Sequence, residues 1–278
     1  MPVFRVSLIP LFGVASLVAI LAGCWTASES GMAIAICARM IGAWTVGLAI
    51  ALGLARTRRF GSERAALMAS GIILLLLIAS LIDAGLQGVH RWIVLGPVRI
   101  NVAAATMPLL LVMLRGERWA PVVMVLVMLI LVAQPDVSQA TGFALAAASL
   151  VWAEKRGERI AIVAALLMLA AISWFRPDPL PGVLEVEGIV ALAWHRAPIV
   201  AVGAVAALAI ACAAPLVARG RSGDPAAVAV GLYMFVTAVA PVLGEFPVPL
   251  IGISISPVIG FWVSVGLLAR SGSAMAGK

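Results

Sequence analysis

The chain has 278 residues, of which 64% are hydrophobic and only 11% are charged, and its mean hydropathy is +1.16. A soluble globular domain is about half apolar and about a quarter charged, so this composition excludes a cytosolic enzyme, a disordered chain and a secreted disulfide scaffold. The net charge of +7 lies in short loops between apolar runs, which is typical of a membrane protein rather than of a nucleic-acid interface.

Ten continuously apolar runs follow one another along the chain. A membrane-spanning helix needs about 20 mostly apolar residues, and helices satisfy the backbone polar groups that lipid cannot. We therefore predict an all-α polytopic membrane protein, a single integral membrane domain over residues 1–278 with about ten transmembrane helices. The expected spans are residues 6–24, 32–54, 66–82, 101–114, 120–133, 137–153, 160–174, 198–218, 226–243 and 257–269.

The first two runs contain two of the three cysteines. Residues 21–24, Leu-Ala-Gly-Cys, resemble a bacterial lipoprotein cleavage site. However, only Arg5 precedes this run and many further spans follow, so the segment is interpreted as the first span; whether Cys24 carries a lipid stays open. Cys24, Cys37 and Cys212 show neither CxxC nor metal-ligand spacing. They are interpreted as small apolar residues of helices.

Arg39 lies seven residues into the second expected span. An ionisable residue inside a span is costly and indicates a functional role by default. The alternative is a structural one, in which Arg39 extends to the outer headgroups or pairs with Glu29 or Asp83.

The segments expected on the outer side hold most of the remaining polar features. Residues 87–96 contain Trp92, and tryptophan prefers the membrane interface, so an interfacial helix is a structural interpretation that stays open there. Residues 134–136, Gln-Pro-Asp, predict a tight turn. Residues 244–257 are apolar but include three prolines and two glycines, which favours a re-entrant or broken segment covered by protein.

The distribution of Lys and Arg predicts the sidedness. With the N-terminus inside, 14 fall on the inner side: Arg5, Arg56, Arg58, Arg59, Arg64, Arg115, Arg118, Lys155, Arg156, Arg159, Arg219, Arg221, Arg270 and Lys278. Four fall on the outer side: Arg91, Arg99, Arg176 and Arg196. This asymmetry predicts an even number of spans and two cytoplasmic termini. The outer arginines either bind an anionic ligand such as a lipid-linked phosphate or pair with outer carboxylates such as Asp83, Asp136 and Asp178.

Taken in order, these segments resemble the SEDS family (shape, elongation, division and sporulation) of the RodA/FtsW type. The features that carry the resemblance are Arg39 with Gly47 eight residues on, the Gly88, Arg91, Trp92, Ile93, Leu95, Gly96 series, Gln134-Pro135-Asp136, and the pair Pro247 and Pro249. The resemblance implies a SEDS-like helical bundle in the bacterial inner (cytoplasmic) membrane.

The resemblance also implies an activity. The family polymerises lipid II, and the expected substrate here is that or a related polyprenyl-pyrophosphate sugar, on the periplasmic face, in cell shape or division. The expected partner is a class B penicillin-binding protein or a similar membrane protein. Glu187 falls where the family has its catalytic Asp, and the candidate substrate-binding residues are Arg39, Arg91, Trp92, Asp136, Arg176 and Arg196. No cofactor or metal site is implied, although a divalent cation stays an open alternative.

The sequence departs from the family in places that keep two alternatives open. Residues 102–107, Val-Ala-Ala-Ala-Thr-Met, stand near the position of the family's Pro-Ser-Glu-x-x-Lys, and the family's paired glutamates are replaced near His195 and Arg196. These losses favour a catalytically inactive membrane scaffold of the same fold that partners a cell-wall synthase. Arg39 and the broken segment 244–257 would also suit a lipid flippase or transporter.

Overall fold

The computed structural model describes residues 7–57, 62–155, 157–218 and 223–275. Within these ranges, ten helices are apolar, and five of them have at least 18 residues. They are α1 (Leu8–Glu29), α2 (Ile34–Arg56), α3 (Glu63–Ile82), α4 (Val102–Met113), α5 (Ala120–Ala133), α6 (Val137–Ala153), α7 (Arg159–Ser173), α9 (Pro198–Val217), α10 (Pro225–Val239) and α11 (Ile255–Met275). The predicted all-α polytopic membrane architecture is confirmed.

Each of these helices overlaps one of the ten expected spans; most ends agree within four residues, whereas α1 and α11 extend five and six residues further. Several begin at the residues that the local sequence marks as helix starts. Ser62, Asn101 and Asp224 accept backbone hydrogen bonds as N-caps of α3, α4 and α10, and α9 and α10 each have a proline in the first turn. The number of membrane crossings and the cytoplasmic termini stay predictions. Seven of the cations counted for sidedness, Arg5, Arg58, Arg59, Arg156, Arg219, Arg221 and Lys278, lie outside the described residues.

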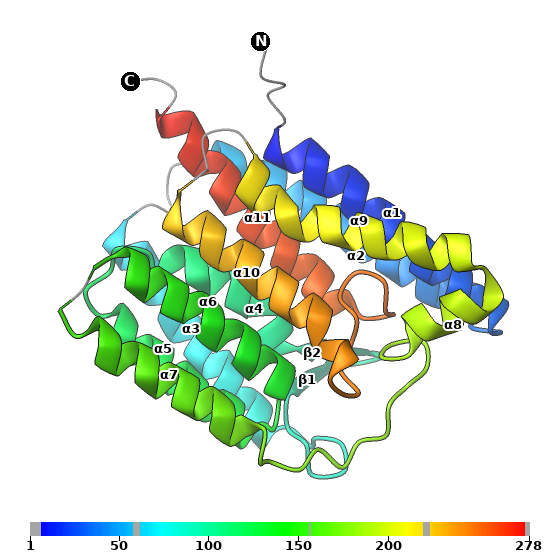
Figure 1. Ribbon diagram of the computed structural model, residues 1–278, viewed down its shortest axis with the longest axis horizontal. Helices are drawn as coiled ribbons and strands as arrows, with labels where there is room; N and C mark the ends of the chain where they lie inside the picture. Colours follow the sequence, from blue (N-terminus) through cyan, green and yellow to red (C-terminus); the bar gives the residue numbers. More distant parts are fainter. Residues whose placement is uncertain (1–6, 58–61, 156, 219–222, 276–278) are drawn as a thin grey trace.

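Helix α11 forms the centre of the bundle, where it packs along α2 and α4 (Figure 1). Its Phe261 and Trp262 are almost completely buried. The contact with α2 depends on glycine, because a Cβ on Gly47 would lie 2.6 Å from Trp262 Cδ1 and one on Gly266 would lie 2.5 Å from Ala51 Cα. Small residues let helix backbones approach this closely in membrane proteins. The Gly47 part of the Arg39–Gly47 pattern thus has a packing role.

The other helices surround this centre. Helix α1 packs on α9, α10 on α6 and α9, α7 on α5 and α6, and α3 on α4. The start of α1 and the end of α11 lie at one end of the bundle, and the short helix α8 (Ile189–Arg196) and a β-hairpin lie towards the other (Figure 1). We call the end that holds α8 and the β-hairpin the hairpin end.

The hairpin corrects one interpretation. Residues 87–96 are not an interfacial helix: β1 (Trp92–Leu95) pairs antiparallel with β2 (Val98–Asn101), with Leu95 opposite Val98. The two residues between the strands are Gly96 and Pro97, and Gly96 has a φ of +59°. A glycine at the first central position suits a two-residue hairpin turn, so turn chemistry decides the structure here rather than the tryptophan.

The expected broken segment follows α10 and a short 3-10 helix (Ala240–Val242). It has no regular helix before α11, yet Val248, Leu250 and Ile251 are buried. Two of its backbone amides donate to the loop before α8: Val248 N to Val186 O at 3.1 Å and Ile253 N to Glu185 O at 3.0 Å. The irregular backbone is therefore covered by protein, as membrane proteins require.

Candidate functional site

A cavity of about 760 Å³ lies at the hairpin end, between the β-hairpin, the start of α2, the start of α6, the loop before α8 and the segment before α11. Five of the seven candidate site residues line it: Arg39, Arg91, Trp92, Asp136 and Glu187. They come from four segments that lie far apart in the sequence. The helical bundle therefore brings together ionisable residues that the sequence left separate.

Glu187 is held in the turn immediately before α8. Its Oε2 accepts a hydrogen bond from Val183 N at 2.7 Å, and its own N–H donates to Val183 O at 2.8 Å. Burial raises the pKa of Glu187; the backbone hydrogen bonds and the positive charge of Arg91 oppose that rise, and the charge of Glu245 adds to it. A half-buried carboxylate with a raised pKa is typical of a group that accepts a proton near neutral pH.

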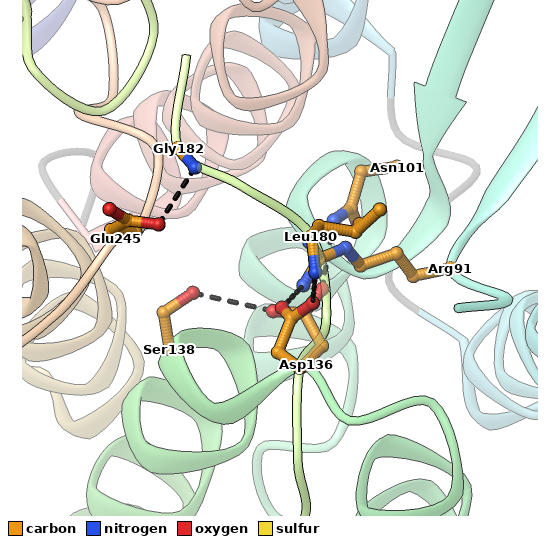
Figure 2. A network of polar contacts seen from close by, with 8 residues as sticks. Arg91, Asn101, Asp136, Ser138, Leu180, Gly182 and Glu245 are labelled. Carbon is orange, nitrogen blue, oxygen red and sulfur yellow. Dashed lines mark hydrogen bonds and ion pairs between the residues drawn. The ribbon is translucent and has the colours of Figure 1, made fainter. Parts of the chain in front are cut away.

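The turn that holds Glu187 rests against the broken segment. A Cβ on Gly252 would lie 2.4 Å from Val186 O and 2.8 Å from Val248 O, so these backbones approach as closely as glycine permits. Glu245, in the same segment, accepts a hydrogen bond from Gly182 N at 2.7 Å (Figure 2). Two chain segments about 60 residues apart thereby fix each other beside the cavity.

Arg91 is buried and pairs with Asp178, with Nη1 2.9 Å from Oδ2. Its guanidinium also lies over the Trp92 ring, 4.6 Å from the centroid, within the range of a cation–π interaction. Asp178 in turn accepts a hydrogen bond from Leu180 N at 3.2 Å. Of the two interpretations of the outer arginines, pairing with an outer carboxylate therefore describes Arg91, although its side chain still lines the cavity.

Asp136 also lines the cavity and is only 2% exposed. Asn101 Nδ2 donates to its Oδ2 at 2.8 Å and Ser138 Oγ donates to its Oδ1 at 3.3 Å (Figure 2). Asn101 also caps α4 through Ala104 N, at 3.0 Å. This network joins the starts of α4 and α6, so the Gln-Pro-Asp turn reverses the chain and also connects two helices at the cavity.

Most of the residues that line the cavity are absent from the sequence-based set of candidates, and among them are the polar residues Asn101, Gln139 and Tyr233. The Tyr233 hydroxyl donates to Gln139 Oε1, and both residues are buried. The sequence contains a signal for Asn101, since an asparagine directly before a long apolar run marks a helix start. Gln139 and Tyr233 lie within apolar helices and had no such signal.

Arg39 is exposed on α2 and lines the cavity. Its Nη1 lies 3.5 Å from Pro97 O, at the outer limit of a hydrogen bond. Among the described residues, its side chain makes no ion pair with Glu29 or Asp83. The expected structural pairing is therefore not what holds Arg39 in place.

The remaining two candidates lie elsewhere. Arg176 follows α7 and Arg196 ends α8; both are exposed, and neither lines the cavity. A cation suits the last turn of a helix such as α8. Within the described part of the chain, no three His, Cys, Asp or Glu side chains gather as metal ligands would.

Comparison with known proteins identifies the fold. No protein-family model matches the chain, and no curated protein matches it significantly. Crystal structures of the Thermus thermophilus rod shape determining protein RodA, as an Asp-to-Ala mutant and without the mutation, match with TM-scores of 0.66 and 0.65 at 17% and 18% identity. Each match covers 94% of this chain, and 96% and 95% of the RodA chains.

A third match comes from the structure of a peptidoglycan synthase complex that coordinates polymerization and crosslinking. It has a TM-score of 0.64 at 18% identity and covers 98% of both chains. Over nearly its whole length, the chain therefore has the SEDS fold of RodA.

Proposed function

We propose that the chain is a divergent SEDS-family glycosyltransferase of the bacterial inner membrane, which extends a polyprenyl-linked glycan precursor at the outer face, in cell shape or division. The observation that carries the proposal is the convergence of Glu187, Arg39, Arg91 and Asp136 on one cavity at the hairpin end. An enzyme that acts on a lipid diphosphate needs a base and cations in one cleft, and this cavity supplies both.

Glu187 is the proposed general base. As the acceptor hydroxyl oxygen bonds to the anomeric carbon of the donor sugar, the hydroxyl proton passes to the Glu187 carboxylate. The bond from that carbon to the diphosphate oxygen breaks, and the lipid diphosphate leaves with the electron pair. The raised pKa of Glu187 makes its carboxylate a stronger base than an ordinary glutamate.

The cations are proposed to act on the leaving group. The guanidinium groups of Arg39 and Arg91 line the same cavity as Glu187, and guanidinium recognises phosphate oxygens in a bidentate geometry. They would stabilise the negative charge that grows on the diphosphate as its bond to the sugar breaks. Arg39 is the freer of the two, because Arg91 already pairs with Asp178.

The experiment that tests this proposal measures glycan polymer formed from purified lipid II. We expect Glu187→Gln to lower the rate by about 10²-fold or more, the range for loss of a general base. The matched control is Glu185→Gln, because Glu185 lies two residues away in the same loop but does not line the cavity. Equal rates for Glu187→Gln and wild type would exclude Glu187 as the base.

A second candidate function is a catalytically inactive scaffold that binds a class B penicillin-binding protein or a similar membrane synthase. The observation that favours it is the lining of the cavity by α4. The segment 102–107, near the place of the family's glutamate and lysine, contributes only Ala104 to the cavity. Absence of polymer from wild type, together with co-purification of a class B penicillin-binding protein that Glu187→Gln does not weaken, would identify this function.

A further inference from the structure

Two of the three cysteines lie side by side where α1 meets α2. Cys24 is five residues before the end of α1, and Cys37 is in the first turn of α2. The Cys37 thiol donates to the Cys24 carbonyl oxygen at 3.5 Å, the two side chains interact, and both are buried. No sequence signal marks this pair, because its spacing of 13 residues matches no familiar cysteine motif.

The position of the pair in the bundle is specific. It lies at the hairpin end, because α1 ends and α2 begins there (Figure 1). Met32, Ile36 and Arg39, around Cys37 in the chain, line the cavity. Neither cysteine lines the cavity, but Cys37 is adjacent in the chain to Ile36 and two residues before Arg39, which do. The third cysteine, Cys212, is buried in α9.

Helix packing alone does not require two neighbouring thiols, since alanine or serine fills such a position equally well. Two neighbouring thiols in an oxidising compartment, in contrast, are the direct precursor of a disulfide. The hairpin end faces that compartment if both termini are cytoplasmic, as the cation distribution predicts. The short turn between α1 and α2 keeps the two helices, and hence the two thiols, together.

We propose that Cys24 and Cys37 form a disulfide that joins the end of α1 to the start of α2 in the oxidising outer compartment. The two thiols lose two protons and two electrons as the sulfur–sulfur bond forms. The electrons pass to the disulfide of an oxidised exchange protein of that compartment, which becomes a dithiol. The bond restrains the first turns of α2, from which Arg39 projects.

The experiment traps thiols in whole bacterial cells that express the full chain. N-ethylmaleimide is added before lysis and kept in excess while the protein is denatured, so that buried free thiols are also blocked. The reagent is then removed, and the protein is reduced and labelled with a polyethylene-glycol maleimide. We expect two labels on wild type and on Cys212→Ala, and none on Cys37→Ser, where the remaining thiols are already blocked. Three thiols that react before reduction, and hence no label on wild type, would overturn the proposal.

Proteolysis identifies the bonded residues. Glu29 is the sole acidic residue between Cys24 and Cys37, so a glutamate-specific protease separates the two cysteines into different peptides. We expect these peptides to stay joined until a reductant is added. The mass of the joined pair should be two hydrogens lower than the sum of the masses of the two reduced peptides. Peptides that separate without reductant, or a Cys24 peptide that carries a lipid, would overturn the proposal. Neither result bears on Glu187, so this test can fail while the proposed glycosyltransferase stands.

Discussion

Glu187 lies among charges that act on it in opposite directions. Burial holds its pKa above the ordinary value of 4.5, Arg91 lowers the pKa and Glu245 raises it. A general base must be ionised, so activity should be present above the pKa and be lost as the pH falls through it. We therefore expect the acid limb of kcat/KM for lipid II polymerisation to lie at higher pH than an ordinary glutamate would give.

Two variants separate these contributions. Glu245→Gln removes a negative charge and should move the acid limb to lower pH, whereas Arg91→Gln removes a positive charge and should move it to higher pH. The position of the limb is the measurement, because Arg91→Gln also lowers the rate if Arg91 binds substrate. If the acid limb shifted to lower pH in both variants, or to higher pH in both, its assignment to Glu187 would be wrong.

Asn101 performs two tasks with one amide group. Its Oδ1 caps α4 and its Nδ2 donates to the buried carboxylate of Asp136. We expect Asn101→Ala to lower the free energy of unfolding by about 0.5–2 kcal/mol for the lost cap. Leaving the buried Asp136 short of a donor should cost about 1–3 kcal/mol more. Denaturation of the detergent-purified protein measures the total.

The control for Asn101 is Ser62→Ala. Ser62 caps α3 through Ala65 N at 3.2 Å and has no buried carboxylate to satisfy. This variant should therefore lose the cap contribution alone, about 0.5–2 kcal/mol. If both variants lost the same free energy, the Asn101–Asp136 contact would contribute nothing to stability.

At the scale of elements, the broken segment before α11 positions the loop that carries Glu187. Gly252→Ala would place a Cβ 2.4 Å from Val186 O, and backbone cannot move aside as a flexible side chain can. We expect a loss of about 1–3 kcal/mol in stability. A displacement of Glu187 by about 1 Å can lower the activity about 10²-fold. Thermal unfolding and lipid II polymerisation measure the two effects separately.

Gly203→Ala is the matched control for Gly252→Ala. Gly203 lies within α9, and a Cβ there would meet no heavy atom within 4 Å. Alanine is the better helix former, so stability and activity should both be kept. Full activity of Gly252→Ala would show that the broken segment does not position Glu187.

The elements that could be predicted from sequence are those whose pattern is long. Ten apolar runs predicted ten helices because each run is long enough to give a clear helix signal, whatever the turn residues beside it. The hairpin of β1 and β2 was missed because each strand has four residues, too few for periodicity to separate strand from helix. The turn pair Gly96-Pro97 was the signal that pointed to it.

The candidate site, too, could be predicted from the sequence only in part. Arg39 could be singled out because an ionisable residue inside a span is costly. Asp136 and Glu187 were found through the motifs that resemble the SEDS family. Their meeting on one cavity depends on how α2, α6 and the loop before α8 pack, which no local pattern contains. Gln139 and Tyr233 lie inside apolar helices, and only the helix rotations show that they face the cavity.

At the scale of the whole molecule, the charges divide between the two ends of the bundle. Arg56, Arg64, Arg115, Lys155 and Arg159 all lie at helix ends opposite the hairpin end. One pair there is partly buried, Arg115 with Asp224 at 2.8 Å. Lys and Arg in short loops favour the cytoplasmic side, so the cavity should open to the outside.

Impermeant labelling of two single cysteines tests this orientation. In a background with Cys24, Cys37 and Cys212 replaced by alanine, Gln87→Cys lies beside the cavity and Gly157→Cys lies in the exposed loop between α6 and α7. A membrane-impermeant maleimide should label Gln87→Cys in intact spheroplasts, and should label Gly157→Cys only after the membrane is permeabilised. The reverse pattern would place the cavity on the cytoplasmic side, where neither a periplasmic glycan polymerase nor a cystine at the hairpin end could exist.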